Sequence, residues 1–368
     1  ILFFTWLTYY TASCDPFQKQ TFVNEQGQEY IDNPECVLEC GCFGNAIPLT
    51  PWESFTKDVV LLFFIIITFL GTYVFGYTKI NTTREDLIIV TASLTLTSLF
   101  ALLMLDWLFP ILFTALVLGA GLIVKRYYKG AGREWVMALG VLIVCMTFQY
   151  QTLAHLPMRD YRPYAVGEDI VYNMKTAEEL GKKSPVYVTM YVLKNKTTGE
   201  TIQMDSEKYL TENIWKDKNL EIADSWGPIT KESGYEPLII DFIIEDYDGN
   251  DVTMEILEGD DIVFLQVTYD LEKADLSNQP AISAFADAAL ADGHRFFGVT
   301  SAGYDESEEF RHQHQCKYPF LVGDEKVLKT MVRANPGIVA IKGGVVQNKW
   351  HYNDLPTYKE AKANQFQD

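Results

Sequence analysis

Cysteine is nearly absent from the C-terminal third of this 368-residue chain. From Asp241 to the end the only cysteine is Cys316, so no Cys-x-x-Cys pair occurs there. Disulfide exchange by a local dithiol needs a thiolate that attacks and a second thiol that resolves the mixed disulfide. The sequence therefore excludes that chemistry from residues 241–368.

Positive charge is also scarce. The chain has 30 Lys and Arg against 49 Asp and Glu, a formal net charge of −19. Residues 168–368 hold 20 of the basic and 36 of the acidic side chains. Because nucleic-acid binding requires a basic patch or stripe, we expect no nucleic-acid partner.

Four long apolar runs indicate a membrane protein. Each has about the length of a helix that crosses the hydrocarbon core, and few charges interrupt them. They are residues 58–77, 87–105, 108–124 and 135–155. Residues 1–12 (ILFFTWLTYYTA) are apolar but too short to span, and they lack the basic start of a signal peptide. We interpret them as the second half of a membrane helix and expect the chain to be truncated before Ile1.

Basic residues in two short loops predict the orientation. Lys79 and Arg84 lie in the loop 78–86, and the loop 125–133 holds four basic residues and no acid. Short loops rich in Lys and Arg stay in the cytoplasm, whereas long domains cross the membrane largely regardless of charge. The loop 13–57, the Asp106–Trp107 corner and residues 156–368 are therefore predicted to face outward.

Four of the six cysteines crowd the first outer loop: Cys14, Cys36, Cys40 and Cys42. An even number of cysteines in an oxidising compartment is typical of structural disulfides, and four allow three pairings. The Cys40-Gly41-Cys42 run also suits a strained, exchanging disulfide. A metal site is a third interpretation, but the loop contains no histidine and no second matching pair. We favour the structural interpretation.

The outer region begins with a polar stretch and then becomes regular. Residues 186–193 and 200–204 predict a hairpin, and 205–235 look helical and then loop-like, with no catalytic pattern. Beyond residue 240 the expected order is as follows: a hairpin of 240–244 with 252–254, strand 262–267, helix 279–292, strand 295–300, helices 307–315 and 326–334, and a hairpin of 338–341 with 345–350.

An apolar strand, a helix and a second apolar strand predict a parallel pair, and the closing hairpin makes the sheet mixed. This order resembles a thioredoxin-like sandwich. Where such a fold carries its dithiol, this chain has a degenerate segment: Asp270, Leu271, Glu272, Lys273, Ala274 and Asp275. Pro336 stands where the fold has a proline that is usually cis and faces the dithiol. The pattern of the fold is kept while its catalytic residues are missing.

The segment from Glu39 to Trp52, ECGCFGNAIPLTPW, resembles the Cys-Gly-Cys-Phe-Gly segment of DoxX/MauE-type membrane proteins. The outer domain is similar to the TlpA-like thioredoxin fold, and the fusion resembles DoxX family proteins of Bacteroidetes. The resemblance implies a bacterial inner-membrane protein with a periplasmic C-terminal domain. It also implies quinone-linked or disulfide-linked redox chemistry, with Cys40 and Cys42 as candidates.

The predicted fold class is a membrane all-α helical bundle, incomplete at its N-terminus, joined to an α/β thioredoxin-like domain with a mixed sheet. The expected divisions are a partial helix and cysteine-rich loop (1–57), four membrane helices (58–155), a linker with an α+β subdomain (156–239), and the thioredoxin-like domain without Cys-x-x-Cys (240–368).

Two functions fit these features. In the first, the protein presents a non-catalytic domain to a protein partner in the cell envelope, with membrane lipid around its helices and no cofactor. In the second, the Cys40/Cys42 pair exchanges electrons with a quinone or a dithiol. The sequence offers no histidine or paired carboxylate within the membrane runs, because Asp106 lies at a helix end and His155 at the surface. We favour the first function.

Overall fold

The computed structural model describes residues 1–14, 20–23, 29–32, 47, 49–76 and 81–364. Contacts divide the chain into two units, each described by itself below. The first unit is Ile1–Ile89 with Ala177–Glu236, and the second is Val90–Thr176 with Pro237–Asp368. The predicted domain boundaries stay a prediction.

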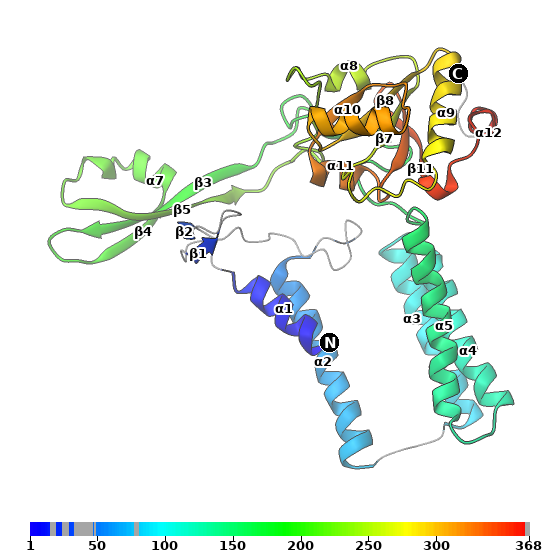
Figure 1. Cartoon of the computed structure of the whole chain (residues 1–368). Helices are drawn as coiled ribbons and strands as arrows, with labels where there is room; N and C mark the ends of the chain where they lie inside the picture. Colours follow the sequence, from blue (N-terminus) through cyan, green and yellow to red (C-terminus); the bar gives the residue numbers. More distant parts are fainter. Residues whose placement is uncertain (15–19, 24–28, 33–46, 48, 77–80, 365–368) are drawn as a thin grey trace. The chain divides into compact units, whose positions relative to one another are not determined.

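Four helices in the described chain are long and apolar enough to span a membrane (Figure 1), and they coincide with the four predicted runs. They are α2 (Pro51–Phe69, continued by the π-helical turn η2, Leu70–Val74), α3 (Thr83–Leu103), α4 (Phe109–Tyr127) and α5 (Arg133–Ala154). Thr50 and Glu53 form a capping box at the start of α2, and Pro51 occupies a first-turn position where no N–H is needed. The N-terminal residues form α1 (Leu2–Ala12), which contacts α2.

The first unit also contains two small sheets. Strands β1 (Gln20–Val23) and β2 (Glu29–Asp32) pair antiparallel. A three-stranded antiparallel sheet has the order β4-β3-β5. Its elements are β3 (Val186–Asn195), β4 (Thr201–Asp205), α7 (Ser206–Thr211), the 3₁₀ turn η3 (Ile214–Lys216) and β5 (Leu220–Glu232).

The predicted hairpin of β3 with β4 is confirmed, whereas the loop predicted after it is wrong. Residues 220–232 form the longest strand of the unit, paired along β3. Their own sequence, LEIADSWGPITKE, has charged residues and a Gly-Pro step that obscure the alternation of a strand. Pairing with β3 supplies the regularity that the local pattern lacks.

The thioredoxin-like domain lies in the second unit and is built on a six-stranded mixed sheet of order β11-β10-β7-β8-β9-β6. Strands β7, β8 and β9 are parallel, and the other neighbours are antiparallel. The elements are α6 (Ile170–Met174), β6 (Ile244–Glu245), α8 (Thr253–Leu257), β7 (Val263–Val267), α9 (Gln279–Ala291), β8 (Arg295–Thr300), α10 (Tyr304–Gln313), β9 (Phe320–Gly323), α11 (Glu325–Met331), β10 (Gly337–Lys342), β11 (Val345–His351), the 3₁₀ turn η4 (Tyr352–Asp354) and α12 (Tyr358–Asn364).

One prediction for this domain is wrong, and one strand was missed. Residues 252–254 do not return as a strand, because Thr253 begins helix α8 and only one bridge, from Glu245 to Asp251, remains of the expected hairpin. Strand β9 was not predicted, since its four residues are too few to show a period. The parallel pair of β7 with β8 and the closing hairpin of β10 with β11 are confirmed.

Alternating side chains of the sheet build two cores. Val263, Leu265 and Val267 of β7 pack in one core with residues of α6, α8 and α11. Ile262 and Phe264 point to the other core, with residues of α9, α10 and α12. All five β7 residues are buried, which is typical of a central strand covered on both faces (Figure 1). The domain is therefore a sheet with helices on each face, as predicted.

Candidate functional site

The degenerate segment and Pro336 meet in the structure. The segment connects the end of β7 to the start of α9, and the Asn335–Pro336 peptide bond is cis. The amide of Asp275 donates to the carbonyl oxygen of Asn335 at 2.8 Å. In return, Asn335 Nδ2 donates to the carbonyl oxygen of Asp270 at 2.7 Å. The sequence-predicted site residues are thus brought together, and two hydrogen bonds hold the segment against the proline loop.

The carboxylates of the segment have their own partners. Lys273 donates to Asp270 from its amide (3.1 Å) and from Nζ (2.6 Å). Asp275 accepts the amide of Ser277 at 2.9 Å and the hydroxyl of Tyr352 at 3.0 Å. The Lys273 hydrogen bond lowers the pKa of Asp270, and the Ser277 hydrogen bond, helped by Tyr352, lowers the pKa of Asp275. Both groups are therefore ionised at neutral pH.

This arrangement supplies neither a thiol nor a carboxyl group with a raised pKa. A general acid must hold a proton near the working pH, and a general base with a lowered pKa is weak. The segment also contains no thiol, so it has no nucleophile for disulfide exchange. Of its remaining residues, Leu271 packs against the core and the Lys273 side chain is 80% exposed. The segment offers a fixed, charged surface rather than reacting groups.

Cys316 is the one thiol of the thioredoxin-like domain, and it is buried behind this site. Its residue is 3% exposed, and Gln279 Nε2 lies 3.5 Å from its sulfur. Gln279 also donates to Tyr318, and Tyr318 donates to the side chain of Gln266. Burial raises the pKa of Cys316, which disfavours the thiolate. A buried thiol in a satisfied polar network is structural rather than reactive.

The cysteine-rich loop lies mostly outside the described residues. This applies to Cys36, Cys40 and Cys42, so their pairing and redox role stay predictions. Cys14, at the end of α1, is disulfide-bonded. Cys145 in α5 is a free cysteine.

A polar contact between α1 and the apolar helix α2 was not predicted from the sequence. Asp58 of α2 is 4% exposed and accepts a hydrogen bond of 3.1 Å from Thr8 Oγ1 of α1. Lys57 Nζ lies 3.3 Å from the other oxygen of Asp58. Ser54, one turn earlier on the same helix, is fully buried, and its hydroxyl finds no partner among the described residues. The signal was Asp58 itself, at the start of the apolar run 58–77.

A buried ion cluster joins the segment after α5 to the thioredoxin-like domain. Arg162 donates from Nε and Nη2 to the two oxygens of Asp160, both at 2.7 Å, and Lys349 Nζ lies 2.5 Å from Asp160 Oδ2. Arg162 also donates to the carbonyl oxygen of Thr330 at 2.6 Å. Burial opposes the charge of Asp160, but Arg162 and Lys349 outweigh it and lower its pKa. The cluster is a structural anchor, since every charge has a partner.

Turn η4 links the candidate site to the end of α5. Tyr352, at the start of the turn, holds Asp275, while Asn353 Nδ2 donates to the carbonyl oxygen of Ala154 at 2.9 Å. Asp354 Oδ1 lies 2.6 Å from Nδ1 of His155. Residues 352–354, which directly follow β11, therefore bind both the degenerate segment and the C-terminal end of α5.

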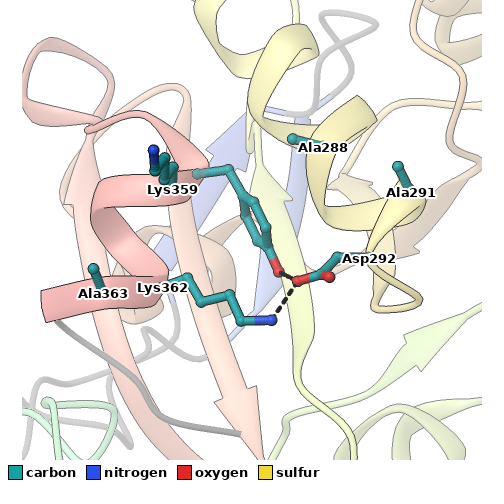
Figure 2. A pocket seen from close by; sticks show the side chains of 7 residues that line it. Ala288, Ala291, Asp292, Lys359, Lys362 and Ala363 are labelled. Atoms are coloured by element: carbon teal, nitrogen blue, oxygen red, sulfur yellow. Dashed lines mark hydrogen bonds and ion pairs between the residues drawn. The ribbon is translucent and has the colours of Figure 1, made fainter.

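A hollow lies between α9 and α12, and Figure 2 shows its lining. Asp292 accepts hydrogen bonds from Tyr358 (2.5 Å) and Lys362 (2.6 Å), while Lys359 points away from that carboxylate. The remaining lining is Ala288, Ala291 and Ala363. The Asp292 carboxylate, the Tyr358 hydroxyl and the Lys362 ammonium bind one another and hold α12 against α9. Within the described residues, no group of three or more His, Cys, Asp or Glu could hold a metal ion.

Comparisons with known proteins add little. No protein-family model matches the chain, and no curated protein does. The chain is similar to the solution structure of a protein proposed to be a disulfide isomerase from Bacteroides thetaiotaomicron, with 17% identity over 33% of this chain and 80% of that one (TM-score 0.27). It is also similar to the crystal structure of StoA from Bacillus subtilis, with 13% identity over 32% and 91% (TM-score 0.26). The thioredoxin-like assignment rests on the strand order and the two cores, not on these likenesses.

Proposed function

We propose that this protein is a membrane-anchored binding protein whose thioredoxin-like domain docks a protein partner and does not exchange disulfides. The observation that carries the proposal is the closed site. Asp270, Asp275 and Asn335 bind one another where a dithiol would lie, and the domain's one thiol, Cys316, is buried. Such a site cannot exchange disulfides through a dithiol of its own, but its hydrogen bonds give a partner a rigid surface to bind.

The location is part of the proposal. The four apolar helices make the chain a multi-pass membrane protein, and the basic loops 78–86 and 125–133 favour a cytoplasmic side for those loops. The helices would then lie in a bacterial inner membrane, with the thioredoxin-like domain on its periplasmic side. The protein would be of the DoxX/MauE type. The ion cluster of Asp160, Arg162 and Lys349 supports a docked domain rather than one on a loose tether.

A disulfide-reduction assay tests the loss of chemistry. The full chain in lipid nanodiscs is mixed with insulin and dithiothreitol, and we expect no acceleration over the reaction without protein. The matched positive control is Glu272→Cys with Asp275→Cys, which installs Cys-x-x-Cys and places one thiol beside Asn335 and the cis proline. We expect that variant to gain activity. Acceleration by the parent chain that disappears in Cys316→Ser would refute the proposal.

A second candidate function is a redox component that uses Cys40 and Cys42, and Asp58 favours it. A buried carboxylate in a membrane helix is costly and often marks a proton pathway. Its bond to Thr8 also has a plain structural explanation, because polar side chains join membrane helices. We therefore keep the redox function second.

Thiol trapping separates the two candidates. The full chain is equilibrated in a series of redox buffers, and free thiols are alkylated and counted. If Cys40 and Cys42 stay oxidised well below about −200 mV, the pair is structural, whereas reduction near about −200 mV supports exchange. Asp58→Asn is the companion variant: it should slow reoxidation only if the carboxylate moves protons. The double variant Cys40→Ser with Cys42→Ser should lower protein abundance if the disulfide is structural.

A further inference from the structure

A strip of the thioredoxin-like domain, residues 237–261, combines exposed aliphatic side chains with unrelieved negative charge. Its 25 residues include nine acidic side chains and no Lys, Arg or His. We call it the acidic strip. Its acids are Asp241, Glu245, Asp246, Asp248, Asp251, Glu255, Glu258, Asp260 and Asp261.

The first part of the strip carries an apolar ridge. Ile239 and Phe242 point inward and are 3% and 1% exposed, within the core that contains α6 and α11. Leu238, Ile240 and Ile243 point outward and are 64%, 79% and 50% exposed, and these three residues are the apolar ridge. Single exposed aliphatics are ordinary, but three within six residues form a patch of the kind that marks an interaction site.

The carboxylates of the strip lack cationic partners. None of the nine forms an ion pair with any described residue, and all are exposed except the half-buried Asp246. Several acids elsewhere in the domain are paired, for example Asp292 with Lys362 and Glu308 with Arg311. One cation contacts the strip: Arg295 donates to the carbonyl oxygens of Glu255 and Ile256, but not to a carboxylate. Like charges that lack ion-pair partners repel one another and attract a cationic partner. The strip is thus complementary to positive charge.

The outer edge of β6, the strand within the strip, already has hydrogen-bond partners, which limits how a partner protein can bind. The carbonyl oxygen of Ile244 accepts the amide of Val252 at 2.9 Å, and Thr253 Oγ1 accepts the amide of Ile244 at 2.8 Å. Because these bonds cover the outer side of β6, a partner cannot extend the sheet by strand addition. Binding must use side chains.

We propose that the acidic strip and its apolar ridge dock a basic polypeptide segment with apolar residues between its Lys and Arg, such as a cationic amphipathic helix. This inference rests on the proposed function and names its partner by chemistry. The aliphatic residues of the segment cover Leu238, Ile240 and Ile243, and its cations face the surrounding carboxylates. Nucleic acids and anionic membranes carry the same sign of charge as the strip and are repelled.

The test uses the full chain in zwitterionic phosphatidylcholine nanodiscs, with empty nanodiscs subtracted. The probe is a fluorescent peptide of Leu and Lys in amphipathic helical spacing, and binding is followed by anisotropy. We expect saturable binding that weakens on the order of tenfold as salt rises from about 0.05 to about 0.3 M. The matched peptide with Glu in place of Lys should not bind. Equal binding of both peptides would overturn the proposal.

Three sets of substitutions locate the site. Leu238→Ser with Ile240→Ser and Ile243→Ser removes the ridge, and Asp241→Lys with Glu245→Lys and Asp248→Lys reverses the charge. Each should weaken binding about tenfold or more. The control set reverses three exposed acids of the first unit, Glu200→Lys, Glu212→Lys and Asp224→Lys, and should change the affinity less than about twofold.

A control set that weakens binding as much as the charge-reversal set would overturn the proposal, because it would show attraction to net charge alone. Unchanged binding by the ridge set would also overturn it. If the ridge set fails to fold, Ile240→Ser alone replaces it, since that side chain is 79% exposed. If the chain binds the peptide and also reduces insulin, the docking surface stands and only the proposal that the domain does not exchange disulfides is refuted. If the chain neither reduces insulin nor binds the peptide, only the docking surface is refuted.

Discussion

The degenerate segment and the acidic strip are two charged surfaces of one domain, and they differ in whether a carboxylate has a cation beside it: Asp270 pairs with Lys273, whereas no acid of the strip forms an ion pair with a described residue. Asp270 and Asp275 each accept hydrogen bonds from nearby residues, and the segment is tied to Asn335. The nine carboxylates of the strip have no ion-pair partner among the described residues. Asp246 and Asp251 of the strip accept hydrogen bonds from neighbouring amides, but neither forms an ion pair with a described residue. Carboxylates without an ion-pair partner gain more from a cationic ligand than carboxylates that are already paired. The comparison favours the strip over the degenerate segment as the place where the proposed partner binds.

The largest effect is expected where charges are both buried and paired. Asp160→Asn leaves the cations of Arg162 and Lys349 in the interior without their counter-charge. We expect a loss of about 3–5 kcal/mol in the free energy of unfolding. Urea titration of the purified chain, followed by tryptophan fluorescence, measures it. Asp248→Asn on the acidic strip is the matched control, and an equal loss there would refute the contrast.

Acid should weaken the same cluster. The pKa of Asp160 is lowered from its ordinary value of 3.8, so the folded state binds its proton less readily than the unfolded chain. The stabilisation is therefore present above pH 3.8 and is lost as the pH falls below it. Thermal melts of the parent chain should shift down over that window, and Asp160→Asn should show a smaller shift. A parallel shift of both proteins would contradict the role given to Asp160.

A smaller effect is expected at the degenerate segment. Tyr352→Phe removes one hydrogen bond to Asp275, a residue of which little is buried. We expect a loss of about 0.5–1.5 kcal/mol in the free energy of unfolding. Hydrogen exchange should show faster exchange of the Asp275 amide, which is bonded to Asn335. Unchanged exchange at that amide would mean that Tyr352 does not hold the segment.

The smallest effect on folding is expected at the acidic strip. Neutralising Asp241, Glu245 and Asp248 as Asn, Gln and Asn removes mutual repulsion and breaks no side-chain bond found in the structure. The free energy of unfolding should stay within about 0.5 kcal/mol or rise slightly. The same variant should bind the cationic peptide less well. A clear loss of stability would show that these charges have folding partners and would weaken the docking proposal.

Local pattern made much of the fold predictable. The four membrane helices follow from the length of their apolar runs, and the pair of β7 with β8 follows from buried strands around a helix. Pattern failed for β5, whose regularity comes from its neighbour, and for the short β9. Strand order fixes where a connection lies, and Asn335, the neighbour of Pro336, is hydrogen-bonded to the segment 270–275. The role of these residues stays a prediction.

Other features were beyond local sequence. Asp58 and Thr8 lie fifty residues apart in the chain and meet only because α1 packs against α2. Lys349 joins Asp160 across a still longer separation. A charged residue such as Asp58 in an apolar run can be noticed in the sequence, but the identity of its partner leaves no local signal.

Composition and order alone determined that the chain enters a membrane, that its last domain has the thioredoxin-like succession of elements, and that this domain lacks a dithiol. Those properties depend on residue type and local spacing. Only the tertiary structure decided that the replaced segment is closed by Asn335, that Cys316 is buried, and that the strip at 237–261 keeps its charges unpaired. Hydrogen bonding, burial and charge pairing are properties of neighbours in space, and the chain brings those neighbours together only when it folds.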